Sequence, residues 1–177
     1  MKAHRKGLLP LFLAGMIVVG TGCGSMVPIS DSTEAIAVSE LVGTWQIVDD
    51  NDELPDQVVI LNFNDSEYYV ELQERKLDAS KADTLRLRVY VTAVEGRRFI
   101  NAQHIGSMKP DERVFFFYAY DFSPEGVLTL TELQDVGEQE IDKFETSEAL
   151  NAFIRENVHN EALYGTSTQL IRVNVAG

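Results

Sequence analysis

The chain has 177 residues, with 28 acidic residues against 15 Lys and Arg, and a formal net charge of −13. Nucleic acid and bare anionic lipid surfaces are poor electrostatic partners, because binding to them needs basic stripes that this chain lacks. A single cysteine cannot form an intramolecular disulfide, so the fold must depend on its hydrophobic core, and the length suits one domain.

The first 22 residues are typical of an export signal. Lys2, Arg5 and Lys6 precede an apolar run over 8–19, which is shorter than the about 20 apolar residues of a membrane span. We therefore expect residues 1–22 to be a signal peptide that is removed. The signal holds three basic and no acidic residues, so its removal leaves 12 basic and 28 acidic residues and a net charge of −16.

Cys23 follows this run directly, in the sequence VVGTGC. The pattern resembles the lipobox of bacterial lipoproteins, in which small residues precede a cysteine that carries diacylglycerol. The resemblance implies that Cys23 is an acylated N-terminus, with palmitate-type chains as a stable membrane anchor. Gly24 in place of aspartate implies a lipoprotein of the outer membrane that faces the periplasm. The alternative is an incidental small apolar residue near a cleavage site.

Residues 23–40 combine small, polar and acidic residues without a sustained period. Such a composition is expected of a flexible connection, so we predict a lipidated tether over this range. The folded domain is expected over residues 41–177, and the sequence shows no internal repeat.

The first predicted hairpin has a tight turn at Asp65-Ser66. This turn would put an apolar set on the core face, namely Val59, Leu61, Phe63, Tyr68, Val70 and Leu72. The opposite face would be mostly polar and would carry Val58, Ile60, Asn62, Tyr69, Glu71 and Gln73.

The second predicted hairpin turns at Glu95-Gly96. Its core face would carry Leu87, Val89, Val91, Ile100, Ala102 and His104. The other face, with Arg88, Tyr90, Asn101 and Gln103, is expected to be in contact with water.

The third predicted hairpin, with a turn over 123–126, is apolar on both faces. One face would hold Phe116, Tyr118, Tyr120 and Phe122, and the other Phe115, Phe117, Leu128 and Leu130. Such a strand pair needs cover on both sides. A helix within residues 145–160 can supply it, because Thr146 or Ser147 can cap its start and Leu150, Phe153, Ile154 and Val158 share one stripe.

With short strands near residues 43–49 and 168–175, the pattern predicts about seven strands, one helix and a final strand. This order favours a mainly β fold, an antiparallel up-and-down β-barrel that carries the helix outside, before the last strand. An open α+β sheet is the alternative.

The residues Gly43, Thr44 and Trp45 resemble the G-x-W motif of lipocalins, and the helix before the closing strand agrees with that plan. The resemblance implies a lipocalin-like barrel in which Trp45 closes the bottom and a late basic residue, Arg172, packs across it. The chain departs from the family in having seven strands before the helix instead of eight, and in having Thr131-Glu132-Leu133 where a T-D-Y motif would stand.

The sequence contains no nucleophile elbow, phosphate loop, zinc spacing or C-x-x-C, so we expect no enzyme and no cofactor. His159 is expected to be a favourable charge at a helix C-terminus. His104 faces the core, where it would either bond a neighbour or contact a ligand. The acidic run 49–56 does not place EF-hand ligands correctly, so a solvated loop is expected instead of a metal site.

Two functions remain open. The first is a lipid-anchored barrel that binds a small hydrophobic or amphipathic ligand, with Tyr68, Val89, Val91, Ile100 and His104 as candidate contacts. In lipocalin-like barrels the first loop rims the mouth, so its acidic residues would suit neutral or cationic ligands. The second is a protein-binding lipoprotein, an inhibitor or envelope assembly factor, whose barrel is filled by side chains.

Overall fold

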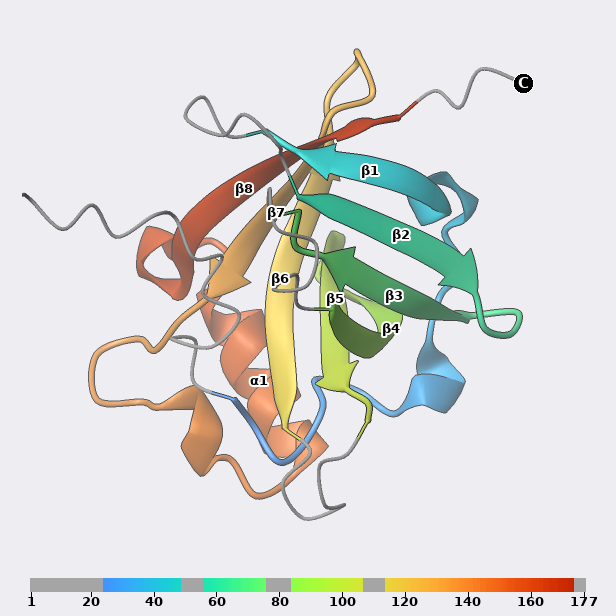
Figure 1. The fold of residues 1–177 in the computed structure, drawn as a ribbon. Helices are drawn as coiled ribbons and strands as arrows, with labels where there is room; N and C mark the ends of the chain where they lie inside the picture. The colour runs from blue at the N-terminus through green and yellow to red at the C-terminus, as the bar shows by residue number, and fades with distance from the viewer. Residues whose placement is uncertain (1–23, 49–55, 76–83, 107–113, 174–177) are drawn as a thin grey trace, which may run out of the picture.

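The computed structural model describes residues 24–48, 56–75, 84–106 and 114–173. These residues form a closed antiparallel barrel in which each strand pairs with its sequence neighbours and the first pairs with the last (Figure 1). The strands are β1 (Gly43–Ile47), β2 (Gln57–Asn62), β3 (Glu67–Gln73), β4 (Thr84–Val94), β5 (Arg97–His104), β6 (Phe115–Phe122), β7 (Leu128–Leu133) and β8 (Tyr164–Arg172). The helix α1 (Ser147–Asn157) precedes β8. The predicted barrel is confirmed, and the open sheet is excluded.

The β4–β5 hairpin has the predicted register. Leu87 pairs with His104 and Val91 pairs with Ile100. The two-residue turn explains this, because Glu95 and Gly96 both have positive φ, 49° and 80°, which matches the twist of a tight hairpin. The second face was wrongly expected to be wet, since Tyr90 and Asn101 are 2% and 0% exposed. Other parts of the chain cover it.

The register predicted for β2–β3 is wrong by one residue. Ile60 pairs with Val70, so Ile60 faces inward, whereas Leu61 and Phe63 are 50% and 67% exposed. The connection is longer than the expected turn: the amides of Phe63 and Asn64 both donate to the Glu67 carbonyl. A slip of one residue moves every side chain of a strand to the opposite face.

The β6–β7 faces also need correction. Leu128 pairs with Phe122 and Leu130 with Tyr120, so both leucines share the inner face with the tyrosines and not with Phe115 and Phe117. The connection has five residues, 123–127, and the Ser123 amide donates to the Val127 carbonyl at 2.9 Å. The extra residue reverses the expected parity of β7.

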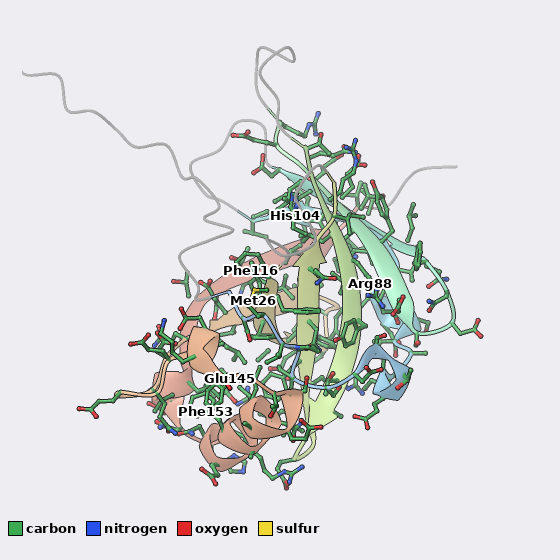
Figure 2. The ribbon with its side chains drawn as sticks, turned by 90° about the horizontal axis from the view of Figure 1, so that it is seen from below. Met26, Arg88, His104, Phe116, Glu145 and Phe153 are labelled. Atoms are coloured by element: carbon green, nitrogen blue, oxygen red, sulfur yellow. The ribbon has the colours of Figure 1, made fainter. Side chains whose placement is uncertain are left out.

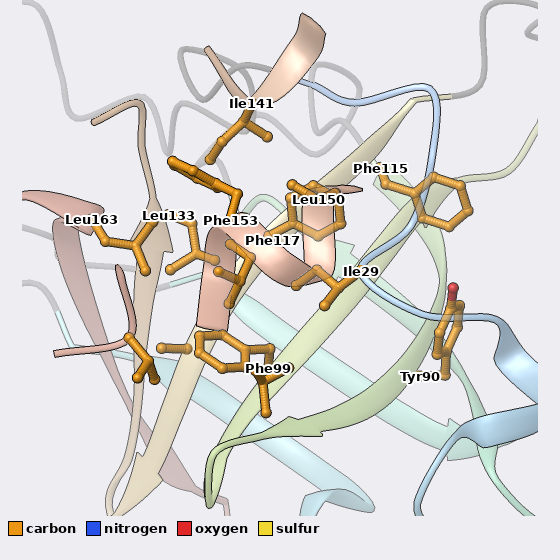
Figure 3. Packing of buried hydrophobic residues seen from close by; sticks show 14 residues of the cluster. Ile29, Tyr90, Phe99, Phe115, Phe117, Leu133, Ile141, Leu150, Phe153 and Leu163 are labelled. Atoms are coloured by element: carbon orange, nitrogen blue, oxygen red, sulfur yellow. The ribbon is translucent and has the colours of Figure 1, made fainter. Parts of the chain in front are cut away.

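Two hydrophobic clusters lie on either side of the sheet. The barrel interior holds Trp45, Val91, Tyr120, Leu128 and their neighbours. The second cluster, which we call the outer core, lies outside β4, β5 and β6 under α1, and its largest members are shown in Figure 3. The third predicted hairpin therefore has cover on both faces.

Helix α1 covers the outer core as its sequence predicts. The Thr146 hydroxyl accepts a hydrogen bond from the Ala149 amide at 3.2 Å, which caps the helix. Leu150, Phe153 and Ile154 are at most 2% exposed. Burying each such side chain contributes roughly 1.5–3 kcal/mol.

Residues 24–42, which we call the N-terminal strap, pack against the barrel, so the expected flexible tether is wrong for the described part of 23–40. Ser25 pairs with Phe115 at the start of β6, and Ile36 pairs with Val91 on β4. Ile29 is fully buried in the outer core. The strap continues through the short helices η1 (Ser32–Glu34) and η2 (Ser39–Leu41) to the start of β1. Its patternless sequence reflects contacts that change from one residue to the next.

Candidate functional site

One end of the barrel, which we call the floor, is closed around Trp45. The indole Nε1 donates to the Leu41 carbonyl at 2.8 Å, and the side chain is 1% exposed. The Arg172 guanidinium lies 4.4 Å from the centroid of the indole ring and donates to the Val42 carbonyl at 2.7 Å. It also donates to the Glu40 carbonyl. Arg172 thus joins the last strand to the strap and shields the indole from water.

Gly43 makes this arrangement possible. Its φ is +147°, which side chains rarely adopt, and a Cβ at this position would come within 2.5 Å of Arg172 Nη1. Gly43, Trp45 and Arg172 therefore form one structural unit. The glycine leaves room for the Arg172 guanidinium and adopts the positive φ that the backbone needs there.

Four of the five candidate contact residues lie in the packed part of the interior. Val91 is fully buried, and Tyr68, Val89 and Ile100 are 2%, 5% and 7% exposed. The Tyr68 phenol oxygen accepts the Val38 amide hydrogen, so this polar group already has a partner. These four side chains are thus already packed, and of the five only His104 is partly exposed.

The opposite end, which we call the mouth, is where β5 ends at His104 and β6 begins. Interior side chains toward this end are apolar but only partly buried, and they are Val58, Leu72, Leu87, Tyr118 and Leu130. Leu87 pairs directly with His104. The connecting residues 49–55, 76–83 and 107–113 lie outside the described residues, as does most of the acidic run 49–56. Among the described residues, most of the partly buried interior side chains thus lie toward the mouth.

Three polar side chains face the mouth half of the interior. His104 Nδ1 is buried and has no hydrogen-bond partner among the described residues (Figure 2 labels His104). Tyr118 pairs across the strands with Glu132. Burial, with a smaller contribution from the Glu132 carboxylate, raises the pKa of the Tyr118 phenol to about 12. Tyr118 therefore keeps its proton at neutral pH and can donate it to an acceptor.

Sequence reasoning did not single out Tyr118 or Glu132 as site residues. The alternation of Leu128, Leu130 and Glu132 would have placed Glu132 inside, but only once the inner parity of β7 was known. His159, the other histidine considered, is exposed just beyond α1.

A hollow lies on the protein surface, near the floor. It is an open groove of about 450 Å³ lined by Ala37, Ser39, Asn62, Phe63, Asn64, Asp65 and Tyr68. Leu61 and Phe63, both exposed, stand beside it on or just after β2. The groove offers an apolar edge on the protein surface instead of an enclosed site.

The described residues contain no cluster of three or more His, Cys, Asp or Glu that could hold a metal ion. Within the same residues no helix is long and apolar enough to cross a membrane. Comparisons with family models, curated proteins and solved structures find no match for this chain.

Proposed function

We propose that this chain is a lipid-anchored, lipocalin-like β-barrel of the bacterial outer membrane, facing the periplasm, that holds a small hydrophobic or amphipathic molecule in its mouth half. The observation that supports the ligand is the set of apolar interior side chains toward the mouth that are only partly buried. Binding sites for small molecules are mostly apolar with a few placed polar groups. Leu72, Leu87 and Leu130 would contact the apolar body, and His104, Tyr118 and Glu132 the polar end.

The expected affinity is modest. Burying roughly 200 Å² of apolar ligand surface contributes about 5 kcal/mol before the entropy cost of association. His104 Nδ1 supplies a further hydrogen bond, because it has no partner among the described residues. Micromolar binding of a single-chain amphiphile would agree with this proposal, and no catalytic role is assigned to His104.

The test is the substitution Leu87→Trp. Leu87 is only partly buried beside His104, so the larger ring would occupy ligand space without displacing the floor. A bulky residue at Val89, in contrast, would overpack a residue that is already 5% exposed. Leu61→Trp is the matched control, because Leu61 is 50% exposed on the outer face.

We expect a fluorescent fatty-alcohol probe, which is uncharged, to bind the parent and Leu61→Trp equally and to lose at least about tenfold in affinity, about 1.4 kcal/mol, with Leu87→Trp. Thermal melts of the three proteins check that the fold is retained. If the parent binds no probe below the concentration at which the probe aggregates, the ligand proposal is wrong.

The second candidate function is protein binding by the outer surface, as an inhibitor or envelope assembly factor. The exposed Leu61 and Phe63 beside the open groove favour it, because solvent-exposed apolar groups next to one another often mark interaction sites. A parent that binds no probe, together with loss of a co-purifying protein in a Phe63→Ser variant, would favour this function over the first.

A further inference from the structure

The strap holds its first described residues at the mouth. Ser25 exchanges two backbone hydrogen bonds with Phe115, of 2.9 and 2.7 Å, at the start of β6. Ser25 is fully buried. A Cβ on Gly24 would lie 2.7 Å from Val114 Cγ2 and 3.5 Å from Phe116 Cε1, so the backbone lies directly against the rim. Figure 2 labels Phe116 and the neighbouring Met26.

A buried polar network fixes the strap below this point. The Ile29 amide donates to Asn101 Oδ1 at 2.9 Å, and Asn101 Nδ2 donates to Thr92 Oγ1 at 2.9 Å. The Ser30 hydroxyl bonds the same Thr92 hydroxyl at 2.8 Å. Asn101 is fully buried with both ends of its amide satisfied. Such networks favour one arrangement strongly, because every alternative leaves buried polar groups without partners.

A second set of contacts holds the strap near the floor. Arg88 donates both to the Ser32 hydroxyl, at 3.1 Å, and to the Glu67 carboxylate. The Tyr90 hydroxyl donates to the Ser30 carbonyl at 2.9 Å. The strap is thus attached to β4, β5 and β6 along its length. It cannot swing as a tether without breaking these bonds.

This attachment has a consequence for a lipid on the preceding residue. Consecutive Cα atoms are about 3.8 Å apart, so a lipid on the residue before Gly24 would be attached one residue from the point at which the strap is fixed. A free connection of the same 17 residues, 24–40, could reach roughly 60 Å and would let the barrel take any orientation. A packed strap removes that freedom.

On the basis of the proposed lipid anchor and ligand site, we infer that the strap turns the mouth of the barrel toward the bilayer. The ligand is then a single-chain amphiphile that is taken from or delivered to that same membrane. Met26, 54% exposed next to the anchor point, adds an apolar contact on the membrane side. The floor, with Arg172 and the groove beside Phe63, faces away from the membrane and toward the aqueous phase.

Orientation can be measured with single labels. The chain has one cysteine, which acylation blocks, so a new cysteine is the only free thiol of the acylated protein. Thr84→Cys is at the exposed start of β4, at the mouth end, and Glu125→Cys is in the exposed turn between β6 and β7, at the floor end. Each acylated variant is labelled with bimane and reconstituted into phosphatidylcholine vesicles that carry a nitroxide quencher on the lipid headgroup.

We expect the label at position 84 to be quenched several-fold more than the label at position 125. Inserting ten Gly and Ser residues between Cys23 and Gly24 should abolish the difference while leaving the protein on the vesicles, because a flexible linker restores free rotation. The same insertion should slow the transfer of the fluorescent fatty-alcohol probe from the vesicles to the barrel. Equal quenching at the two positions without the insertion, or stronger quenching at 125, would overturn the inference.

The failure of this inference can be told apart from failure of the proposed function. The soluble Cys23→Ser protein measures probe binding without any membrane. If it binds the fatty-alcohol probe but the labels show the opposite orientation, the inference is wrong and the ligand proposal stands. If it binds no probe, the ligand proposal fails whatever the labels show.

Discussion

The substitution Gly43→Ala tests the structural unit at the floor. The new methyl group meets Arg172 Nη1 at 2.5 Å, and the backbone must keep a φ of +147°. A non-glycine residue in such a sparsely populated region costs about 1–3 kcal/mol. Displacing Arg172 weakens its bonds to the Val42 and Glu40 carbonyls. We put that loss at about 1–2 kcal/mol because the guanidinium is exposed, with about 0.5–1 kcal/mol more for its contact with Trp45.

The sum is about 4 kcal/mol, which lowers the Tm by roughly 8–16 °C for a domain of this size. Circular dichroism melts of both proteins in a Cys23→Ser background measure it. Gly96→Ala is the matched control: Gly96 also has a positive φ, +80°, but a Cβ there meets nothing within 4 Å. Gly96→Ala should therefore lower the stability only by the cost of the positive φ, about 1–3 kcal/mol.

A double-mutant cycle separates the two contributions. In an Arg172→Ala background the clash is absent, so Gly43→Ala should cost only the conformational part, about 1–3 kcal/mol. If Gly43→Ala costs the same with and without Arg172, the glycine does not serve to make room for the arginine.

Two further predictions concern acid stability and the anchor. The Arg88 guanidinium, through its hydrogen bond, is the main cause that holds the pKa of Glu67 below its ordinary value of 4.5. The stability that this carboxylate contributes is therefore present above pH 4.5 and is lost as the pH falls through the lower folded pKa. The urea midpoints of the parent and Glu67→Gln should differ at pH 7 and converge at low pH. A difference that stays constant with pH would contradict this prediction. Cys23→Ser should release the protein from membranes into the soluble fraction on sedimentation, and retention as firm as in the parent would show that the lipobox interpretation is wrong.

Local sequence determined the parts of this protein whose pairing is set by neighbouring residues. The turn at Glu95-Gly96 has two residues with positive φ, so it fixes the register of β4 on β5 and turns His104 inward. The cap at Thr146 and the stripe of α1 likewise depend on spacings within one helix. The order of hairpins and helix was enough to predict a closed barrel.

Tertiary structure decided what the local pattern leaves open. Residues 58–61 are apolar on both faces, so alternation alone cannot say whether Ile60 or Leu61 faces inward; the longer connection to β3 decides it. The strap looked like a tether because its residues contact β6, β5, β4 and the floor in turn, and no single period describes four different surfaces. Tyr118 and Glu132 became candidate site residues for the same reason: a side chain's place in a barrel depends on strand pairing across the sheet, which the sequence of one strand does not contain.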